Sequence, residues 1–123
     1  MEKEKRILVV DDDPGILEML GEVLSYYGYK VSTLSRGDKI FDRINEYHPD
    51  LILMDIMLAG MDGRTICRDI KSVENSGNIP IILISASEND ASWLNREGAP
   101  NDFLPKPFDL DFLMKKIEHQ LAA

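Results

Sequence analysis

The chain of 123 residues has one cysteine, two histidines and no long apolar run. With Cys67 alone it can form neither an intrachain disulfide nor a cysteine zinc cluster. His48 and His119 are too few for a histidine-based metal site without carboxylate ligands. A membrane span needs about 20 consecutive apolar residues, and the charged start of the chain does not resemble a signal peptide. We therefore expect a cytoplasmic protein that does not enter a membrane.

Basic residues are also scarce, with 14 Lys and Arg against 22 Asp and Glu, which gives a net charge of -8. Binding to a phosphate backbone relies on clustered Lys and Arg. We therefore expect no direct nucleic-acid binding by this domain. The hydrophobic content of 44% allows one buried core, and the length suits a single domain.

Short aliphatic runs alternate with segments of helical periodicity. The runs predict strands at Arg6–Val10, Lys30–Leu34, Asp50–Met54, Ile79–Ile84 and Asp102–Leu104. The apolar faces of four predicted helices contain Ile16, Leu17, Leu20, Val23, Leu24 and Tyr27; Ile40, Phe41 and Ile44; Ile66, Cys67 and Ile70; and Leu110, Leu113, Met114, Ile117 and Leu121. A weaker helix is expected around Asp90 to Glu97. Five strands alternating with five helices predict an α/β fold with a doubly wound parallel sheet.

Residues typical of helix starts and ends support these boundaries. Asp13 before Pro14 is typical of a helix start, with the aspartate as N-cap. Gly28 is expected to end that helix, and Asp109 to cap the last one. Leu58 to Gly63 is expected to be a loop.

Polar side chains follow the predicted strands where each one ends. Asp11 and Asp12 follow the first strand, Asp55 the third and Ser85 the fourth, and Lys106 lies just beyond the fifth. In a doubly wound sheet, ligands bind beyond the carboxyl ends of the strands. We therefore expect these residues to converge there.

Three carboxylates brought together repel one another, so either one of them is protonated or a cation is present. Oxygen ligands open to water suit a hard divalent ion, with Mg²⁺ the best candidate and Mn²⁺ an alternative. A carboxylate beside such an ion can act as a nucleophile toward phosphorus. Ser85 and Lys106 would donate to the phosphoryl oxygens.

The chain resembles the receiver domain of two-component response regulators over essentially its whole length, residues 1–123. The resemblance rests on five runs in the family's order: Ile7-Leu8-Val9-Val10-Asp11-Asp12-Asp13-Pro14, Leu51-Ile52-Leu53-Met54-Asp55-Ile56-Met57, Met61-Asp62-Gly63, Ile84-Ser85-Ala86 and Lys106-Pro107-Phe108. It implies a flavodoxin-like fold with strand order 2-1-3-4-5. It also implies a signalling switch that assists its own phosphorylation and dephosphorylation, rather than an enzyme with a separate substrate.

The resemblance assigns the chemistry of the site. Asp55 is expected to accept the phosphoryl group. Asp12 is expected to bind Mg²⁺ directly, and Asp11 directly or through water. Asp55 completes the carboxylate ligands, and Met57 would contribute only its backbone carbonyl.

The same resemblance assigns the switch. Lys106 would bind the phosphoryl group and form a cis peptide with Pro107. Ser85 matches the switch hydroxyl and Phe103 the switch aromatic, which turns inward when Ser85 moves. The surface of the last strand and the C-terminal helices would then change.

The expected partners also follow from the family. A phosphohistidine on a sensor histidine kinase or on a histidine phosphotransfer protein would be the donor. A downstream effector or an attached output domain would read the change, and a homodimer is possible. The stimulus, the cognate kinase and the output are left open by the residues.

Two residues depart from the family pattern. Ala59 stands where proline is usual, so the loop after Asp55 is expected to be less rigid. Pro100 looks like an extra residue before the last strand and is expected to alter the turn there.

Three other functions compete with this one. A phosphatase of the haloacid dehalogenase type would need an acid two residues after Asp55, where Met57 stands. A nucleotide- or flavin-binding module would need a glycine-rich loop after the first strand, where three aspartates stand instead. A degenerate receiver that serves only for docking would lack one of the key groups, and all are present.

Overall fold

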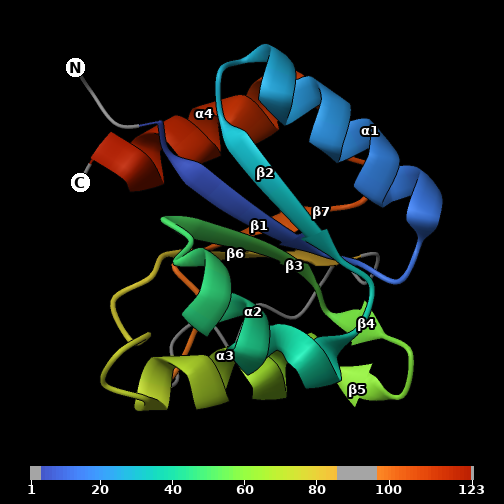
Figure 1. Cartoon of the computed structure of the whole chain (residues 1–123). Coiled ribbons are helices and arrows are strands. Elements are labelled where there is room, and N and C mark those ends of the chain that lie inside the picture. The colour runs from blue at the N-terminus through green and yellow to red at the C-terminus, as the bar shows by residue number, and fades with distance from the viewer. Residues whose placement is uncertain (1–3, 86–96, 123) are drawn as a thin grey trace.

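The computed structural model describes residues 4–85 and 97–122. Its middle layer is a parallel sheet with the strand order β2-β1-β3-β6-β7 (Figure 1). The strands are β1 (Arg6–Val10), β2 (Lys30–Leu34), β3 (Leu51–Asp55), β6 (Ile81–Ser85) and β7 (Asp102–Pro105). Counted along the chain within this sheet, the order is 2-1-3-4-5, so the predicted doubly wound fold is confirmed.

Helices cover both faces of the sheet. They are α1 (Pro14–Tyr26), α2 (Ile40–Tyr47), α3 (Gly63–Ser72) and α4 (Leu110–Ala122), with a short 3-10 helix η1 (Gly37–Lys39) before α2. Figure 1 shows α1 and α4 on one face and α2 and α3 on the other. The fifth helix predicted around residues 90–97, with Trp93 in it, lies outside the described residues except for Glu97, which is in a turn.

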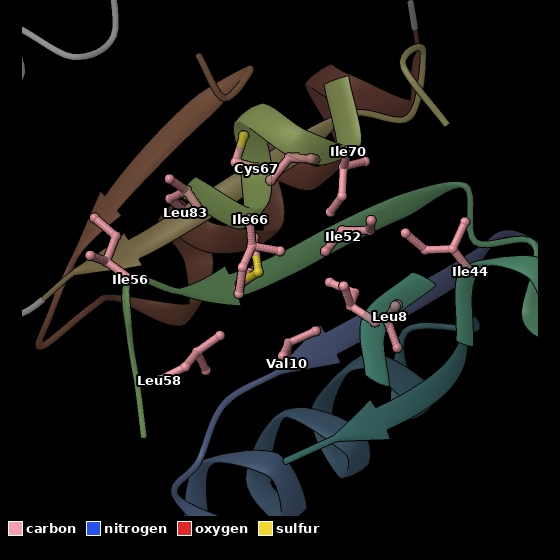
Figure 2. Close-up of a cluster of buried hydrophobic side chains, with 13 residues drawn as sticks. Leu8, Val10, Ile44, Ile52, Ile56, Leu58, Ile66, Cys67, Ile70 and Leu83 are labelled. Carbon is pink, nitrogen blue, oxygen red and sulfur yellow. The ribbon is translucent and has the colours of Figure 1, made fainter. Parts of the chain in front are cut away.

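The core consists of two apolar layers separated by the sheet. Successive side chains of a strand point to opposite faces, so Leu8 and Val10 join one layer while Ile7 and Val9 join the other. Figure 2 shows the layer in which Ile66 of α3 packs against the sheet. Strands buried on both faces explain the continuous aliphatic runs of the sequence.

Three residues predicted to face the core are exposed instead. The exposed fractions are 52% for Tyr27 and 38% each for Phe41 and Leu110. Tyr27 caps the end of α1, Phe41 lies in the first turn of α2, and Leu110 begins α4. Helical periodicity does not tell which apolar residues of a terminal turn contact the sheet: Ile40, next to Phe41 in the first turn of α2, is buried.

The predicted starts of α1 and α4 are confirmed by their hydrogen bonds. The Asp13 carboxylate accepts a bond of 2.8 Å from the backbone N–H of Gly15 at the start of α1. Asp109 accepts one of 2.8 Å from the N–H of Asp111 at the start of α4. These short polar side chains satisfy N–H groups that have no partner within the helix.

The predicted loop after Asp55 is a hairpin, which corrects the expectation. Two-residue strands β4 (Met57–Leu58) and β5 (Met61–Asp62) pair antiparallel around Ala59 and Gly60. Gly60 has φ +75°, a left-handed conformation that glycine adopts without strain. Strands of two residues are too short to show an alternating pattern in the sequence. The expected effect of Ala59 on the rigidity of this segment stays a prediction.

Candidate metal centre

The carboxyl ends of the strands bring the predicted residues together. Asp55 is the last residue of β3 and Ser85 the last of β6, while Asp11 follows β1 directly. Asp55 pairs with Ile84 across the sheet, so Ser85 lies one residue beyond it on the neighbouring strand. The expected convergence follows from this parallel register.

The three predicted carboxylates form one cluster. One oxygen from each of Asp11, Asp12 and Asp55 lies within 4.8 Å of the others. Asp11 is 1% exposed and Asp55 6%, whereas Asp12 is exposed. The cluster therefore has a buried floor and one ligand at the solvent boundary.

Lys106 reaches this cluster from the segment after β7. Its Nζ lies 2.9 Å from Asp55 Oδ2 and 3.3 Å from Asp11 Oδ2. The backbone N–H of Lys106 donates to the carbonyl of Ser85 at 2.7 Å, which anchors the lysine at the end of β6. The peptide bond between Lys106 and Pro107 is cis, as expected.

Backbone N–H groups hold the other carboxylate oxygens. Met57 N–H donates to Asp55 Oδ1 at 3.0 Å, and Asp13 N–H donates to Asp11 Oδ1 at 2.9 Å. In each buried aspartate, one carboxylate oxygen thus accepts a hydrogen bond from the backbone, and the other contacts Lys106 Nζ. Asp13 therefore has a second role beside capping α1, which the sequence reasoning missed.

Burial and the neighbouring charges shift the pKa values of Asp11 and Lys106. Burial raises the pKa of Asp11, and the charge of Asp55 acts in the same direction, although the Asp13 N–H and Lys106 oppose it. Burial alone would lower the pKa of Lys106, but its hydrogen bond to Asp55 and the two nearby negative charges outweigh burial and raise that pKa.

The donor set fits a hard divalent cation. Three carboxylates face one ammonium group, so the cluster has excess negative charge when all are ionised. All of the ligands are oxygens, which Mg²⁺ prefers over nitrogen and sulfur. A cation bound here would relieve repulsion between partly desolvated charges.

The two predicted switch residues occupy neighbouring strands. Ser85 is 2% exposed and pairs with Pro105 in the sheet register. Phe103 on β7 is partly buried. Its backbone N–H donates to Asp102 Oδ1 at 2.7 Å, and the same oxygen accepts a bond of 2.8 Å from Lys116 of α4.

The remaining singled-out residues lie away from the cluster. Cys67 is fully buried in α3, and burial raises the pKa of its thiol to about 11. His48 is an exposed residue after α2 with φ 54°, and His119 is exposed in the last turn of α4. Pro100 follows a turn at Gly98, whose φ is +78°.

Gly63 is a residue near the site to which sequence reasoning assigned no role of its own. A Cβ atom built on Gly63 would lie within van der Waals overlap of the Asp55 carbonyl oxygen and 2.9 Å from Ile56 Cα. The glycine in the run Met61-Asp62-Gly63 was the available signal. The sequence did not indicate that this glycine touches Asp55.

No helix among residues 4–85 and 97–122 is long and apolar enough to cross a bilayer.

The model of the response regulator receiver domain family matches residues 7–118. The DNA-binding response regulator MtrA of Mycolicibacterium smegmatis is 36% identical over 118 residues, which are 95% of this chain and 50% of that protein. Response regulator MprA of a Mycobacterium species is 34% identical over 91% of this chain and 48% of its own length. The chain thus spans about half the length of these relatives.

Solved structures agree with the sequence relatives. Response regulator TrrA of Thermotoga maritima, in complex with Mg²⁺ and beryllium fluoride, superimposes with a TM-score of 0.83 at 32% identity, covering 95% of this chain and 99% of that one. The beryllium-fluoride-activated N-terminal receiver domain of RstA from Klebsiella pneumoniae gives a TM-score of 0.85 at 30% identity, with coverage of 97% and 100%. With its fold, its acidic cluster and these similarities in agreement, the chain belongs to the response regulator receiver domain family.

Proposed function

We propose that the chain, residues 1–123, is a receiver domain that accepts a phosphoryl group on Asp55 in the presence of Mg²⁺. The observation that carries this proposal is the cluster of Asp11, Asp12 and Asp55 oxygens within 4.8 Å, with Lys106 bonded to two of the three residues. A nucleophile, ligands for a metal and a fixed cation for the phosphoryl oxygens therefore lie in one place.

The metal would be held by Asp11, Asp12, Asp55 and the backbone carbonyl of Met57. Antiparallel pairs alternate between hydrogen-bonded and non-bonded. Gly63 N–H donates to the Ile56 carbonyl at 2.7 Å, so the next pair, Met57 with Asp62, is of the non-bonded kind. The Met57 carbonyl is therefore not needed by the hairpin. When bound, Mg²⁺ neutralises charge on the carboxylates and on the phosphoryl oxygens.

The covalent step exchanges one bond to phosphorus for another. A carboxylate oxygen of Asp55 forms the new P–O bond while the P–N bond of a phosphohistidine breaks. The imidazole leaves with the electron pair of that bond and takes up a proton. Lys106 and Ser85 donate hydrogen bonds to the phosphoryl oxygens, which stabilises charge where it develops.

Phosphorylation would switch the surface through its charge of about -1.5 to -2. Ser85 and Lys106 would be drawn toward the phosphoryl group, and Phe103 would turn inward. The surface of β7 and α4 would then change, with two states close enough in energy for one modification to select between them.

The partners follow from this chemistry. A sensor histidine kinase or a histidine phosphotransfer protein would be the donor. Because the matched relatives are about twice as long as the chain, an attached output domain or a separate effector would read the change in β7 and α4. Homodimer formation and the lack of nucleic-acid binding by this domain remain predictions.

The test is incubation with acetyl phosphate and Mg²⁺, followed by intact-protein mass spectrometry. We expect one acid-labile phosphoryl adduct in the wild type and none in Asp55→Asn. Asp42→Asn, at an exposed position of α2, is the matched control and should behave as the wild type. An adduct that persists in Asp55→Asn would overturn the assignment. Replacing Mg²⁺ with Mn²⁺ tests whether the second ion also supports the reaction.

A further inference from the structure

The start of α3 lies against the backbone of the proposed phosphoacceptor. Gly63 is the first residue of α3, and it is buried. A Cβ atom at this position would overlap the carbonyl oxygen of Asp55 and lie 3.2 Å from its carbonyl carbon. These are backbone atoms at the end of a central strand, which cannot swing aside as a side chain can. Only glycine fits this approach without a shift of the main chain.

The backbone of Gly63 also takes part in the pairing of the hairpin after Asp55. Its N–H donates to the Ile56 carbonyl at 2.7 Å, while the Ile56 N–H donates to Ile84 of β6 at 2.9 Å. Ile56 is thus bonded to the sheet on one side and to Gly63 on the other. The pairs Met57–Asp62 and Leu58–Met61 continue this register.

The register has a consequence for the Met57 backbone. Because Ile56 and Gly63 are bonded, the backbone N–H and carbonyl of Met57 point away from Asp62. The N–H accordingly donates to Asp55 Oδ1 at 3.0 Å. A different register would turn both groups into the hairpin and leave that oxygen without its donor.

We propose that Gly63 is a positioning residue of the phosphorylation site. Its missing side chain lets α3 begin against the Asp55–Ile56 peptide, which orients Asp55 and directs the Met57 backbone toward the metal. The inference rests on the proposed function. It assigns to a residue without a side chain the role of orienting ligands, which elsewhere changes metal affinity or activity by about 10- to 100-fold when lost.

The test compares three variants that each add the same methyl group. In Gly63→Ala the methyl meets backbone atoms of Asp55 and Ile56. In Gly37→Ala it meets only side chains, with Ile66 Cδ1 at 2.6 Å and Leu58 Cδ1 at 3.2 Å. In Gly21→Ala, in the middle of α1, the nearest atom outside the helix backbone would be Thr33 Cγ2 at 4.0 Å. Gly37→Ala therefore controls for crowding near the hairpin, and Gly21→Ala for the substitution itself.

Three quantities are measured at a temperature where each variant is folded: the Kd for Mg²⁺ by calorimetry, the rate of phosphorylation by acetyl phosphate at saturating Mg²⁺, and the urea midpoint. We expect Gly63→Ala to weaken Mg²⁺ binding and to slow phosphorylation, each by about 10-fold or more. The two control variants should stay within about twofold of the wild type in both. A purely structural role would move the urea midpoint and leave the other two quantities unchanged.

A second variant covers the case in which Gly63→Ala does not fold. Asp62 caps α3 by accepting a bond of 2.8 Å from the Arg64 N–H. Asp62→Ala loosens the same helix start without adding bulk, so a several-fold loss in Mg²⁺ affinity and phosphorylation rate is expected. Wild-type values in the folded Gly63→Ala, or in Asp62→Ala if the former is unfolded, would overturn the inference. A wild type that accepts no phosphoryl group would instead overturn the proposed function.

Discussion

The two ends of the parallel sheet use polar side chains in opposite ways. At the carboxyl ends, Asp11, Asp12 and Asp55 face a shared space, and Lys106 bonds two of them. At the amino ends, polar side chains bond mainly to the backbone. Arg6 Nη1, for example, donates to the Tyr47 carbonyl at 3.0 Å, where α2 ends.

The amino ends show how such pairing holds neighbouring segments together. Asn101 Oδ1 accepts bonds from the Ile81 N–H at 2.9 Å and from Lys71 Nζ at 2.5 Å. Lys71 Nζ also donates to the Ile79 carbonyl at 2.8 Å. At this end, the polar side chains of Arg6, Lys71 and Asn101 find their partners within the fold. The other end retains unbalanced charge that a ligand can relieve, and it should contribute less to stability and more to function.

The largest expected effect is on the rate of phosphorylation, when the positive charge of Lys106 is removed from the carboxyl end of the sheet. Lys106→Ala should slow phosphorylation by acetyl phosphate by about 100-fold, because a fixed donor to the developing charge is lost. Mg²⁺ should bind more tightly in the same variant, since a competing positive charge has gone. Initial rates by mass spectrometry and calorimetric Kd values measure the two effects. Lys116→Ala, which breaks a 2.8 Å bond to Asp102 instead, should leave the Kd unchanged, and equal changes in both variants would contradict the assignment.

The next largest effect is on the free energy of unfolding, when a hydrogen bond at the amino end of the sheet is removed. Asn101→Ala leaves the N–H of fully buried Ile81 without its acceptor, which costs about 1–3 kcal/mol. The free energy of unfolding in urea should fall by this amount, while the Kd for Mg²⁺ stays that of the wild type. Asn45→Ala, at an exposed position in α2, is the control and should change stability by less than about 0.5 kcal/mol. A loss of Mg²⁺ affinity in Asn101→Ala would mean that the two ends are not independent.

The smallest expected effect is a gain in stability without metal, when the buried charge of Asp11 is removed from the carboxyl end. Asp11→Asn removes a buried charge but keeps a side-chain oxygen that can accept from the Asp13 N–H. Without metal it should stabilise the protein by about 0.5–2 kcal/mol, and it should weaken Mg²⁺ binding about 10-fold. Urea unfolding in the presence of a chelator measures the first quantity. Lower stability of Asp11→Asn without metal would contradict the view that this end is strained by charge.

The stability of the wild type and of Asp11→Asn should depend differently on pH. Burial raises the pKa of Asp11 above its usual value of 3.8, so the folded state binds this proton more tightly than the unfolded state. The penalty for the ionised form is therefore present above the folded pKa and is relieved as the pH falls through it. The metal-free wild type should lose stability relative to Asp11→Asn as the pH rises across this window. Parallel pH profiles for the two proteins would contradict this sign.

Most of the fold could be predicted because its determinants are local. The aliphatic runs of β1, β3 and β6 are buried on both faces, and aspartates at positions 13 and 109 cap helices by bonds within two residues. The hairpin around Ala59 and Gly60 could not be predicted, since strands of two residues leave no periodic signal. The burial of Tyr27 was predicted wrongly because the apolar pattern does not show that α1 ends one residue earlier, at Tyr26.

The sequence by itself determined which chemical groups the protein carries and the strand ends at which they lie, because strand periodicity and chain order are local properties. Only the tertiary structure decided that Lys106 bonds Asp55 and Asp11, residues distant along the chain. It alone also decided that Gly63 touches the Asp55 backbone. Such contacts depend on register and on the close approach of main chains, and the identity of a residue does not encode its distance from another.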